Sequence, residues 1–139
     1  MAFIGSVEDR LTIRERLDAY SDAVFRGDVD DYLACWSEDA TRSGAGGECH
    51  GKPALRAHWH GIFQVLERMT FFVQVAAIDV TGDRATARSY CREILVLKGG
   101  SIRKLIGVYE DELIRVGGDW LFTHRTYQVI LDEGAAVGG

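Results

Sequence analysis

The chain has few of the residues that mark disulfide-rich, metal-binding or membrane-spanning proteins. Its 139 residues contain one proline and three cysteines, Cys35, Cys49 and Cys91. An odd number of cysteines without metal-ligand spacing predicts reduced thiols and no bound metal. No apolar run approaches the roughly 20 residues of a membrane span, and the first residues lack the basic and apolar segments of a signal peptide. We therefore expect a cytoplasmic protein that does not enter a membrane.

Positive charge is also scarce. There are 16 lysines and arginines against 21 aspartates and glutamates, which gives a net charge of −5. The basic residues are scattered, so neither nucleic acid nor an anionic membrane surface is an expected partner. The length is that of one domain with a buried core, which we place at residues 1–139. The segment 133–139, EGAAVGG, is expected to be a flexible tail.

Helical patterns fill the first half of the chain. Ser6, with Asp9 three residues later, is a candidate N-cap, and Gly27 ends the first helix. The apolar residues of this helix recur every three or four positions and share one face: Ile13, Leu17, Tyr20 and Val24. Asp28 is a candidate cap for a short second helix that carries apolar residues as far as Trp36.

A third helix is predicted to begin at Pro53, because proline suits the first turn of a helix. We expect it to run to about Arg68. Its buried stripe consists of Leu55, Trp59, Ile62 and Leu66. Before it, residues 40–51, ATRSGAGGECHG, are expected to form a short strand, a glycine-rich turn and a second short segment.

The second half of the chain is typical of strands. Four segments rich in β-branched and aromatic residues are separated by TGD, GGS and GGD: residues 70–80, 84–98, 102–116 and 119–132. Such short links predict an antiparallel meander. Because long antiparallel strands curl, helices that cover the concave side would enclose a pocket. The expected fold class is therefore α+β, a cone in which three N-terminal helices close a curved sheet.

Five motifs follow one another between about residues 6 and 132. They are Y-x4-F-R-G-D-V-D, W-S-E-D-A, H-G-K-P-A-L-R-A-H-W, G-V-Y-E-D-E-L and W-x4-R. This order resembles the SnoaL-like branch of the NTF2-like superfamily, which includes polyketide cyclases, scytalone dehydratase, a bile-acid dehydratase and a dehydrochlorinase. The resemblance implies the cone fold and chemistry without a metal or redox cofactor, in which a proton is removed or shifted on a hydrophobic substrate.

The catalytic dyad of the dehydratase-like relatives is not found in this sequence. In those relatives an Asp lies on the first helix, five residues after a Tyr or Lys, and pairs with a His at the start of the first long strand. Tyr20 matches the Tyr, but Phe25 stands at the Asp position. The segment 68–75, RMTFFVQV, has no His, and the matching position falls within residues 69–71. The position of the ketosteroid isomerase base is Gly44. This part of the pocket therefore favours binding over proton transfer.

Other polar residues could carry the chemistry. Strand alternation places Cys91 and Glu93 on the pocket face, and a bile-acid dehydratase has a catalytic carboxylate at the position that matches Glu93. Arg125 matches a pocket arginine of the dehydrochlorinase. The candidate catalytic residues are Tyr20, His58, Glu93 and Arg125, with Arg42 an alternative electrostatic partner. The candidate ligand-binding residues are Phe25, Trp36, Arg42, Trp59, Phe71, Cys91, Tyr109 and Tyr127.

Each polar candidate also has a purely structural interpretation. Glu93 could form an ion pair with Arg125 or Arg103. His58, beside the apolar stripe of the third helix, could occupy an edge of the core. Arg42 could extend out of the mouth of the cone into water.

Three functions remain open from the sequence. The first is a cofactor-independent lyase, isomerase or cyclase acting on a small hydrophobic, aromatic or polyketide-like molecule by general acid-base catalysis. The second is a non-catalytic protein in which Phe25, Phe71 and Phe72 line a dry pocket for an apolar ligand. The third and weakest is a structural subunit. Apolar groups on the outer face of the sheet predict self-association, as a homodimer or else a trimer.

Overall fold

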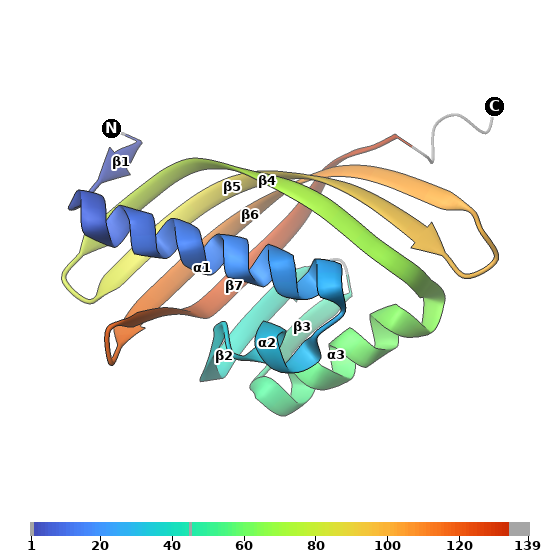
Figure 1. The fold of residues 1–139 in the computed structure, drawn as a ribbon, viewed down its shortest axis with the longest axis horizontal. Coiled ribbons are helices and arrows are strands. Elements are labelled where there is room, and N and C mark those ends of the chain that lie inside the picture. The colour runs from blue at the N-terminus through green and yellow to red at the C-terminus, as the bar shows by residue number, and fades with distance from the viewer. Residues whose placement is uncertain (1, 45, 134–139) are drawn as a thin grey trace.

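The computed structural model describes residues 2–44 and 46–133, so most of the expected tail, residues 134–139, lies outside the described residues. Within them the helices are α1 Val7–Arg26, α2 Val29–Leu33 and α3 Lys52–Val65. The strands are β1 Phe3–Ile4, β2 Trp36–Gly44, β3 Gly47–His50, β4 Leu66–Thr81, β5 Arg84–Leu97, β6 Ile102–Val116 and β7 Asp119–Asp132. Figure 1 shows α1 lying across the sheet, with α2 and α3 grouped near the start of β4.

The ends of α1 follow the sequence signals. The Ser6 hydroxyl accepts a hydrogen bond from the Asp9 backbone N–H at 3.0 Å. At the other end Gly27 adopts a left-handed conformation with φ 68°, which glycine reaches without steric cost. The Asp28 carboxylate then caps α2 by accepting from the Asp31 N–H at 3.0 Å. The chain therefore makes a sharp turn at residues 27–28, as predicted.

Two element boundaries differ from the expectation. α2 ends at Leu33, and Trp36 is the first residue of β2. α3 ends at Val65, and Leu66 already pairs with Leu97 of β5. In both places the apolar spacing continues unchanged from the helix into the strand, so the pattern did not reveal where the helix stopped.

The sheet has the order β1-β4-β5-β6-β7-β2-β3. β4 to β7 form the predicted antiparallel meander. β2 pairs in parallel with β7, which places Arg42 beside Arg125. β1, which no sequence pattern predicted, pairs in parallel with β4. The chain thus returns its N-terminal half to both edges of the meander.

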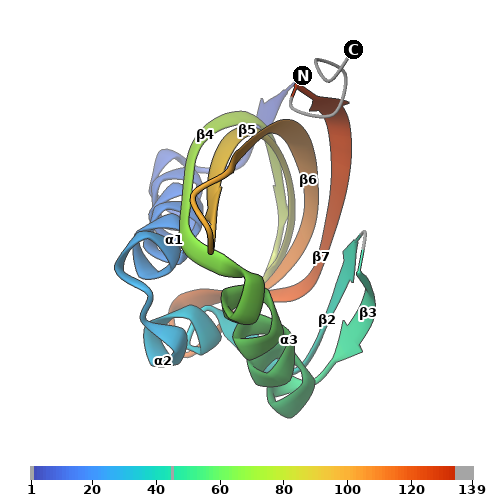
Figure 2. The same ribbon diagram turned by 90° about the vertical axis from the view of Figure 1, so that its right-hand side faces the viewer.

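The meander is strongly curled. In Figure 2 the strands β4–β7 form an arch, with α1 along one side and α3 across its lower end. A cluster of buried aromatic residues fills the space between helices and sheet: Tyr20, Tyr32, Trp36, Phe71 and Phe122. The predicted cone is confirmed. Among the described residues, none of the helices combines the length and apolar character needed to cross a membrane.

Candidate functional site

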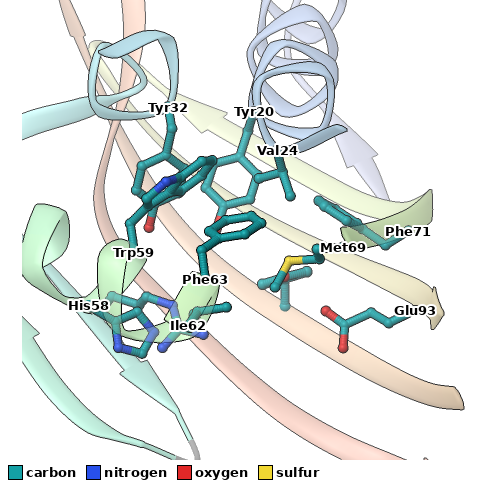
Figure 3. A pocket seen from close by; sticks show the side chains of 12 residues that line it. Tyr20, Val24, Tyr32, His58, Trp59, Ile62, Phe63, Met69, Phe71 and Glu93 are labelled. Carbon is teal, nitrogen blue, oxygen red and sulfur yellow. The ribbon is translucent and has the colours of Figure 1, made fainter. Parts of the chain in front are cut away.

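The inside of the cone holds a small cavity of about 50 Å³. Seven of the sequence-predicted site residues line it: Tyr20, Arg42, His58, Trp59, Phe71, Glu93 and Tyr109. Figure 3 shows His58 and Glu93 on opposite sides of this space, with Met69 between them and the rings of Tyr20, Tyr32 and Trp59 gathered along one wall. The polar groups therefore border an interior that is otherwise lined by aromatic and aliphatic side chains.

A second, more open cavity of about 360 Å³ adjoins the first. Five residues line both: Arg42, His58, Ile62, Met69 and Glu93. Ligand pockets typically measure about 300–1,000 Å³ and combine apolar walls with a few convergent polar groups. The inner cavity alone is too small for a hydrophobic substrate, so a ligand would occupy the outer cavity and touch the inner one at its polar end.

Glu93 is the buried acid of this site. Its side chain belongs to the alternating buried face of β5, where Ala87, Ser89 and Cys91 are also buried, as the sequence predicted. It is 6% exposed, and its carboxylate accepts a hydrogen bond from the Tyr127 hydroxyl at 2.7 Å. Burial raises the pKa of Glu93 above its ordinary value, although Tyr127 and Arg42 oppose this shift.

Neither ion pair that could have made Glu93 structural is formed. Arg125 pairs with Asp111, and Arg103 pairs with Asp132. Among residues 2–44 and 46–133 Glu93 has no ion pair. Its carboxylate is therefore hydrogen-bonded to a neutral partner, Tyr127, and Glu93 lines the pocket.

Gly107 of β6 makes room for Tyr127. A Cβ atom added at Gly107 would lie 2.6 Å from Cζ of the Tyr127 ring, well inside van der Waals contact. We expect Gly107→Ala to push the ring off β6, to weaken its hydrogen bond to Glu93, and to lower the free energy of unfolding by about 1–3 kcal/mol. Urea denaturation measures the loss. Adding Tyr127→Leu to Gly107→Ala should recover part of it, and full stability in the single variant would contradict this steric account.

His58 and Arg42 face Glu93 from the helical and β2 sides of the pocket. Nε2 of His58 and Nη1 of Arg42 are both buried, and neither has a hydrogen-bond partner in the described part of the chain. Burial, assisted by the nearby Arg42 charge, lowers the pKa of His58, so the imidazole is neutral at pH 7. A neutral His can accept or donate one proton, which suits it to act beside a buried carboxylic acid.

Arg125 does not line either cavity, although it was predicted as a catalytic residue. It is 1% exposed, and its Nε donates to the Asp111 carboxylate at 2.8 Å. Its guanidinium lies 3.7 Å from the ring centroid of Tyr109 and 4.2 Å from that of Tyr20. Burial raises the pKa of Asp111 to about 6, against the opposing effect of Arg125. Arg125 thus lies behind the pocket wall and supports it.

At the positions where the resemblance placed the dyad, Phe25 and Phe71 are aromatic and apolar. Phe25, in the last turn of α1, stacks on Phe71 with ring centroids 6.2 Å apart. Phe71 is buried and lines the pocket, whereas Phe25 is 41% exposed and lies outside the lining. Phe72 is 73% exposed because neighbouring strand residues face opposite sides. The predicted dry pocket of three phenylalanines is therefore not formed; only Phe71 faces inward.

Two further predicted ligand-binding residues lie behind the lining. Trp36 is fully buried at the start of β2, because α2 ends before it. Cys91 lies on the pocket face of β5 but is covered, and burial raises the pKa of its thiol to about 12. The last predicted wall residue, Tyr127, lines the outer cavity.

Five residues that line the inner cavity were not among the predicted site residues: Val24, Tyr32, Ile62, Phe63 and Met69. The apolar stripes of α1 and α3 contain Val24 and Ile62, so the period of those helices marks the side that faces the pocket. Whether Tyr32, Phe63 and Met69 reach the cavity depends on how α2 and α3 are placed against the sheet. No local sequence pattern predicts that placement.

A curled, mostly antiparallel sheet closed by three helices around a pocket defines a protein of the NTF2-like class. The SnoaL-like domain family matches residues 5–126, and the chain belongs to this family. None of the curated proteins matches it significantly.

Solved structures share the fold over almost the whole chain. One is a candidate aromatic ring hydroxylase from Novosphingobium aromaticivorans, with 26% identity, a TM-score of 0.85, and coverage of 91% of this chain and 92% of that one. A candidate scytalone dehydratase from the same organism has 21% identity, a TM-score of 0.84, and coverage of 91% and 87%. A type 2 hexachlorocyclohexane dehydrochlorinase, LinA, has 15% identity, a TM-score of 0.83, and coverage of 91% and 88%. The neighbours in this fold therefore include a dehydratase and a dehydrochlorinase, and a ketosteroid isomerase-like protein is also among them.

Proposed function

We propose that the protein is a cofactor-independent lyase, isomerase or cyclase that moves a proton on a small hydrophobic substrate. The observation that carries this proposal is Glu93, a buried carboxylate on the pocket wall that has a hydroxyl partner and no ion pair among the described residues. A carboxylate whose pKa is raised by burial can act as a base or an acid near neutral pH.

The three polar side chains have complementary roles in this proposal. Glu93 removes a proton from a carbon next to a carbonyl group, and Tyr127 holds the carboxylate in place. The guanidinium of Arg42, which lines both cavities, supplies positive charge that holds and orients the substrate. Neutral His58, on the opposite wall, exchanges the second proton with the substrate. Return of the proton to another carbon is an isomerisation, and protonation of a departing hydroxyl is a dehydration.

The reactions of two structural neighbours, a candidate scytalone dehydratase and a dehydrochlorinase, support a reaction of this kind. Dehydration and dehydrochlorination both remove a proton together with a leaving group. The dyad of the dehydratase-like relatives is replaced here by Phe25 and the residues 69–71, so the acid-base function moves to Glu93. A purely apolar cavity would favour a carrier of apolar ligands instead. The buried acid and the unpaired His58 weigh against that alternative.

The pH dependence of proton exchange tests the proposal without knowledge of the natural substrate. Small aryl ketones and acyl aromatic acids would be incubated with the protein in D₂O, and NMR would follow the loss of the proton next to the carbonyl. Glu93 must be ionised to act as the base. Because burial raises its pKa, the acid limb of kcat/KM should lie above 4.5, the ordinary value for glutamate. A panel without any catalysed exchange, or an acid limb at or below 4.5, would argue for the carrier.

We also propose that the protein works as a homodimer joined through the outer face of the sheet. Tyr90 and Ile130 lie on this face and are 42% and 56% exposed, and Val108 lies between them on β6. We expect sedimentation to give about twice the chain mass, and Tyr90→Glu with Val108→Glu to give monomers. A wild-type chain that sediments as a monomer would refute this assembly, and three times the mass would replace it with the trimer.

A further inference from the structure

We propose that Arg42 binds a carboxylate, so that the substrate of this pocket is a small organic acid with an apolar body about the size of two fused rings. The inference rests on the proposed function in one respect: it takes this pocket to be the substrate site. It adds the chemical class of the substrate, which the fold and the relatives leave open.

Nη1 of the Arg42 guanidinium has no acceptor among residues 2–44 and 46–133. This atom has almost no contact with solvent and no hydrogen-bond partner in those ranges. Arg42 also forms no ion pair with any residue in the described ranges. An arginine stays charged at all physiological pH values, and a buried charge without a partner is costly. An anion that enters the pocket would remove that cost.

Other arginines that are partly or fully buried do have acceptors. Arg16 donates to the Trp120 carbonyl at 2.7 Å, and Arg125 donates to Asp111 at 2.8 Å. Arg115 pairs with Asp83 as well as with Asp9. Nη1 of Arg125 is also buried without a partner among the described residues, but each of these three arginines has at least one acceptor that holds its guanidinium. At Arg42 the acceptor is left to a ligand.

The position of Arg42 lets a ligand reach it. It lines the inner cavity and also the outer one, which is open to solvent. The remaining outer wall is largely aliphatic: Val65, Leu66, Leu95, Leu97, Leu105 and Val129. A molecule with one anionic end and an apolar body matches this arrangement, because the body covers the aliphatic wall while the charged end meets Arg42.

The electrostatics around Arg42 favour a single negative charge. The groups that interact with it include the hydroxyls of Tyr20, Tyr32 and Tyr109 and the thiol of Cys49. The charge of Glu93 also interacts with Arg42, but the carboxylate of Glu93 is hydrogen-bonded to Tyr127. A planar carboxylate fits the fork of guanidinium N–H donors, with two parallel hydrogen bonds. A doubly charged phosphate would bring more negative charge towards Glu93.

A matched pair of ligands tests the proposal by calorimetry at pH 8. Naphthalene-2-carboxylate and naphthalene-2-carboxamide have nearly the same shape, but only the first is charged. We expect the wild-type protein to bind the acid about 10- to 100-fold more tightly than the amide. Arg42→Gln should bring the two affinities to within about twofold, mainly through weaker binding of the acid. Arg42→Lys keeps the charge without the fork and should retain part of the preference; it also serves if Arg42→Gln does not fold.

Arg103, the other arginine at the mouth, provides the competing explanation. Arg103→Gln should leave the preference for the acid in place, since this guanidinium already pairs with Asp132. Equal affinities in the wild type, a preference that survives in Arg42→Gln, or one that disappears in Arg103→Gln would each overturn the proposal. Glu93→Gln separates it from the proposed function. If the wild type bound the carboxylate preferentially but catalysed no proton exchange, Arg42 would remain the binding site of the carboxylate. The proposed enzymatic function would then be rejected.

Discussion

A Glu93→Gln variant should lose proton-exchange activity by about 10²–10⁴-fold while it keeps its fold, because that is the usual contribution of a positioned general acid or base. Glutamine has nearly the same shape, and its carbonyl oxygen can still accept the hydrogen bond from Tyr127. It cannot take up the substrate proton. NMR exchange rates measured on the best ketone from the wild-type panel give the comparison, with kcat and KM determined separately.

Measuring the stability of Glu93→Gln tests whether a loss of activity reflects a loss of structure. The pKa of Glu93 in the folded protein is raised by burial. Glu93 therefore favours the folded state below its unfolded pKa, and this contribution is lost as the pH rises through the folded value. At pH 8 glutamine avoids the cost of burying a charge, so Glu93→Gln should melt at a higher temperature than the wild type. This difference should shrink towards pH 4.

Glu110→Gln is the matched control, since Glu110 is a strand glutamate that is exposed on the outer face of β6. We expect its exchange rate and melting temperature to change little. If Glu93→Gln exchanged protons at the wild-type rate, Glu93 would not be the base. His58, the other titratable side chain that lines both cavities, would then be the candidate base.

Much of the fold was predictable because its signals are local. Ser6 and Gly27 bound α1 through capping and left-handed geometry that a few residues determine. The β5 face that includes Cys91 and Glu93 follows from strict alternation, since every second residue from Ala85 to Glu93 is buried. The same alternation predicted that Glu93 lies on the pocket face. Where helix and strand share one apolar spacing, as at Leu66, the local signal could not place the boundary.

The partners of the polar residues were harder to predict, because strand register decides them. The sequence left Arg125 free to pair with Glu93, but the register of β6 and β7 sets Arg125 opposite Asp111. That register includes irregularities between Ile106 and Gly107 and between Glu112 and Leu113, and each shifts the pairing of everything beyond it. Nothing in the sequence of either strand alone reveals such a shift.

Removing the Asp111 carboxylate should strongly destabilise the protein. We expect Asp111→Ala to lower the free energy of unfolding by about 3–5 kcal/mol, because it leaves the fully buried Arg125 charge unpaired. The aromatic rings around Arg125 stay in place but replace only part of the lost attraction. Urea denaturation at pH 7 measures the effect. Asp111→Asn keeps an acceptor for the Arg125 Nε and should cost less.

A double variant separates the ion pair from the space that it fills. Asp111→Val with Arg125→Met leaves no buried charge, and apolar replacements of buried ion pairs are often neutral or stabilising. We therefore expect it to recover most of the stability lost in Asp111→Ala. A double variant as unstable as the single one would mean that the pair is specifically required, and an Asp111→Ala loss below about 1 kcal/mol would mean that water reaches Arg125.

The double variant also decides the role of Arg125 in catalysis. The sequence made Arg125 a catalytic candidate, whereas its contacts are with Asp111 and with the rings of Tyr20 and Tyr109 rather than with the pocket space. If its role is to hold those rings, a folded double variant should exchange protons within about tenfold of the wild type, since only the precision of the wall changes. A stable double variant that loses exchange as completely as Glu93→Gln would instead show that the Arg125 charge acts on the reaction through the tyrosine wall.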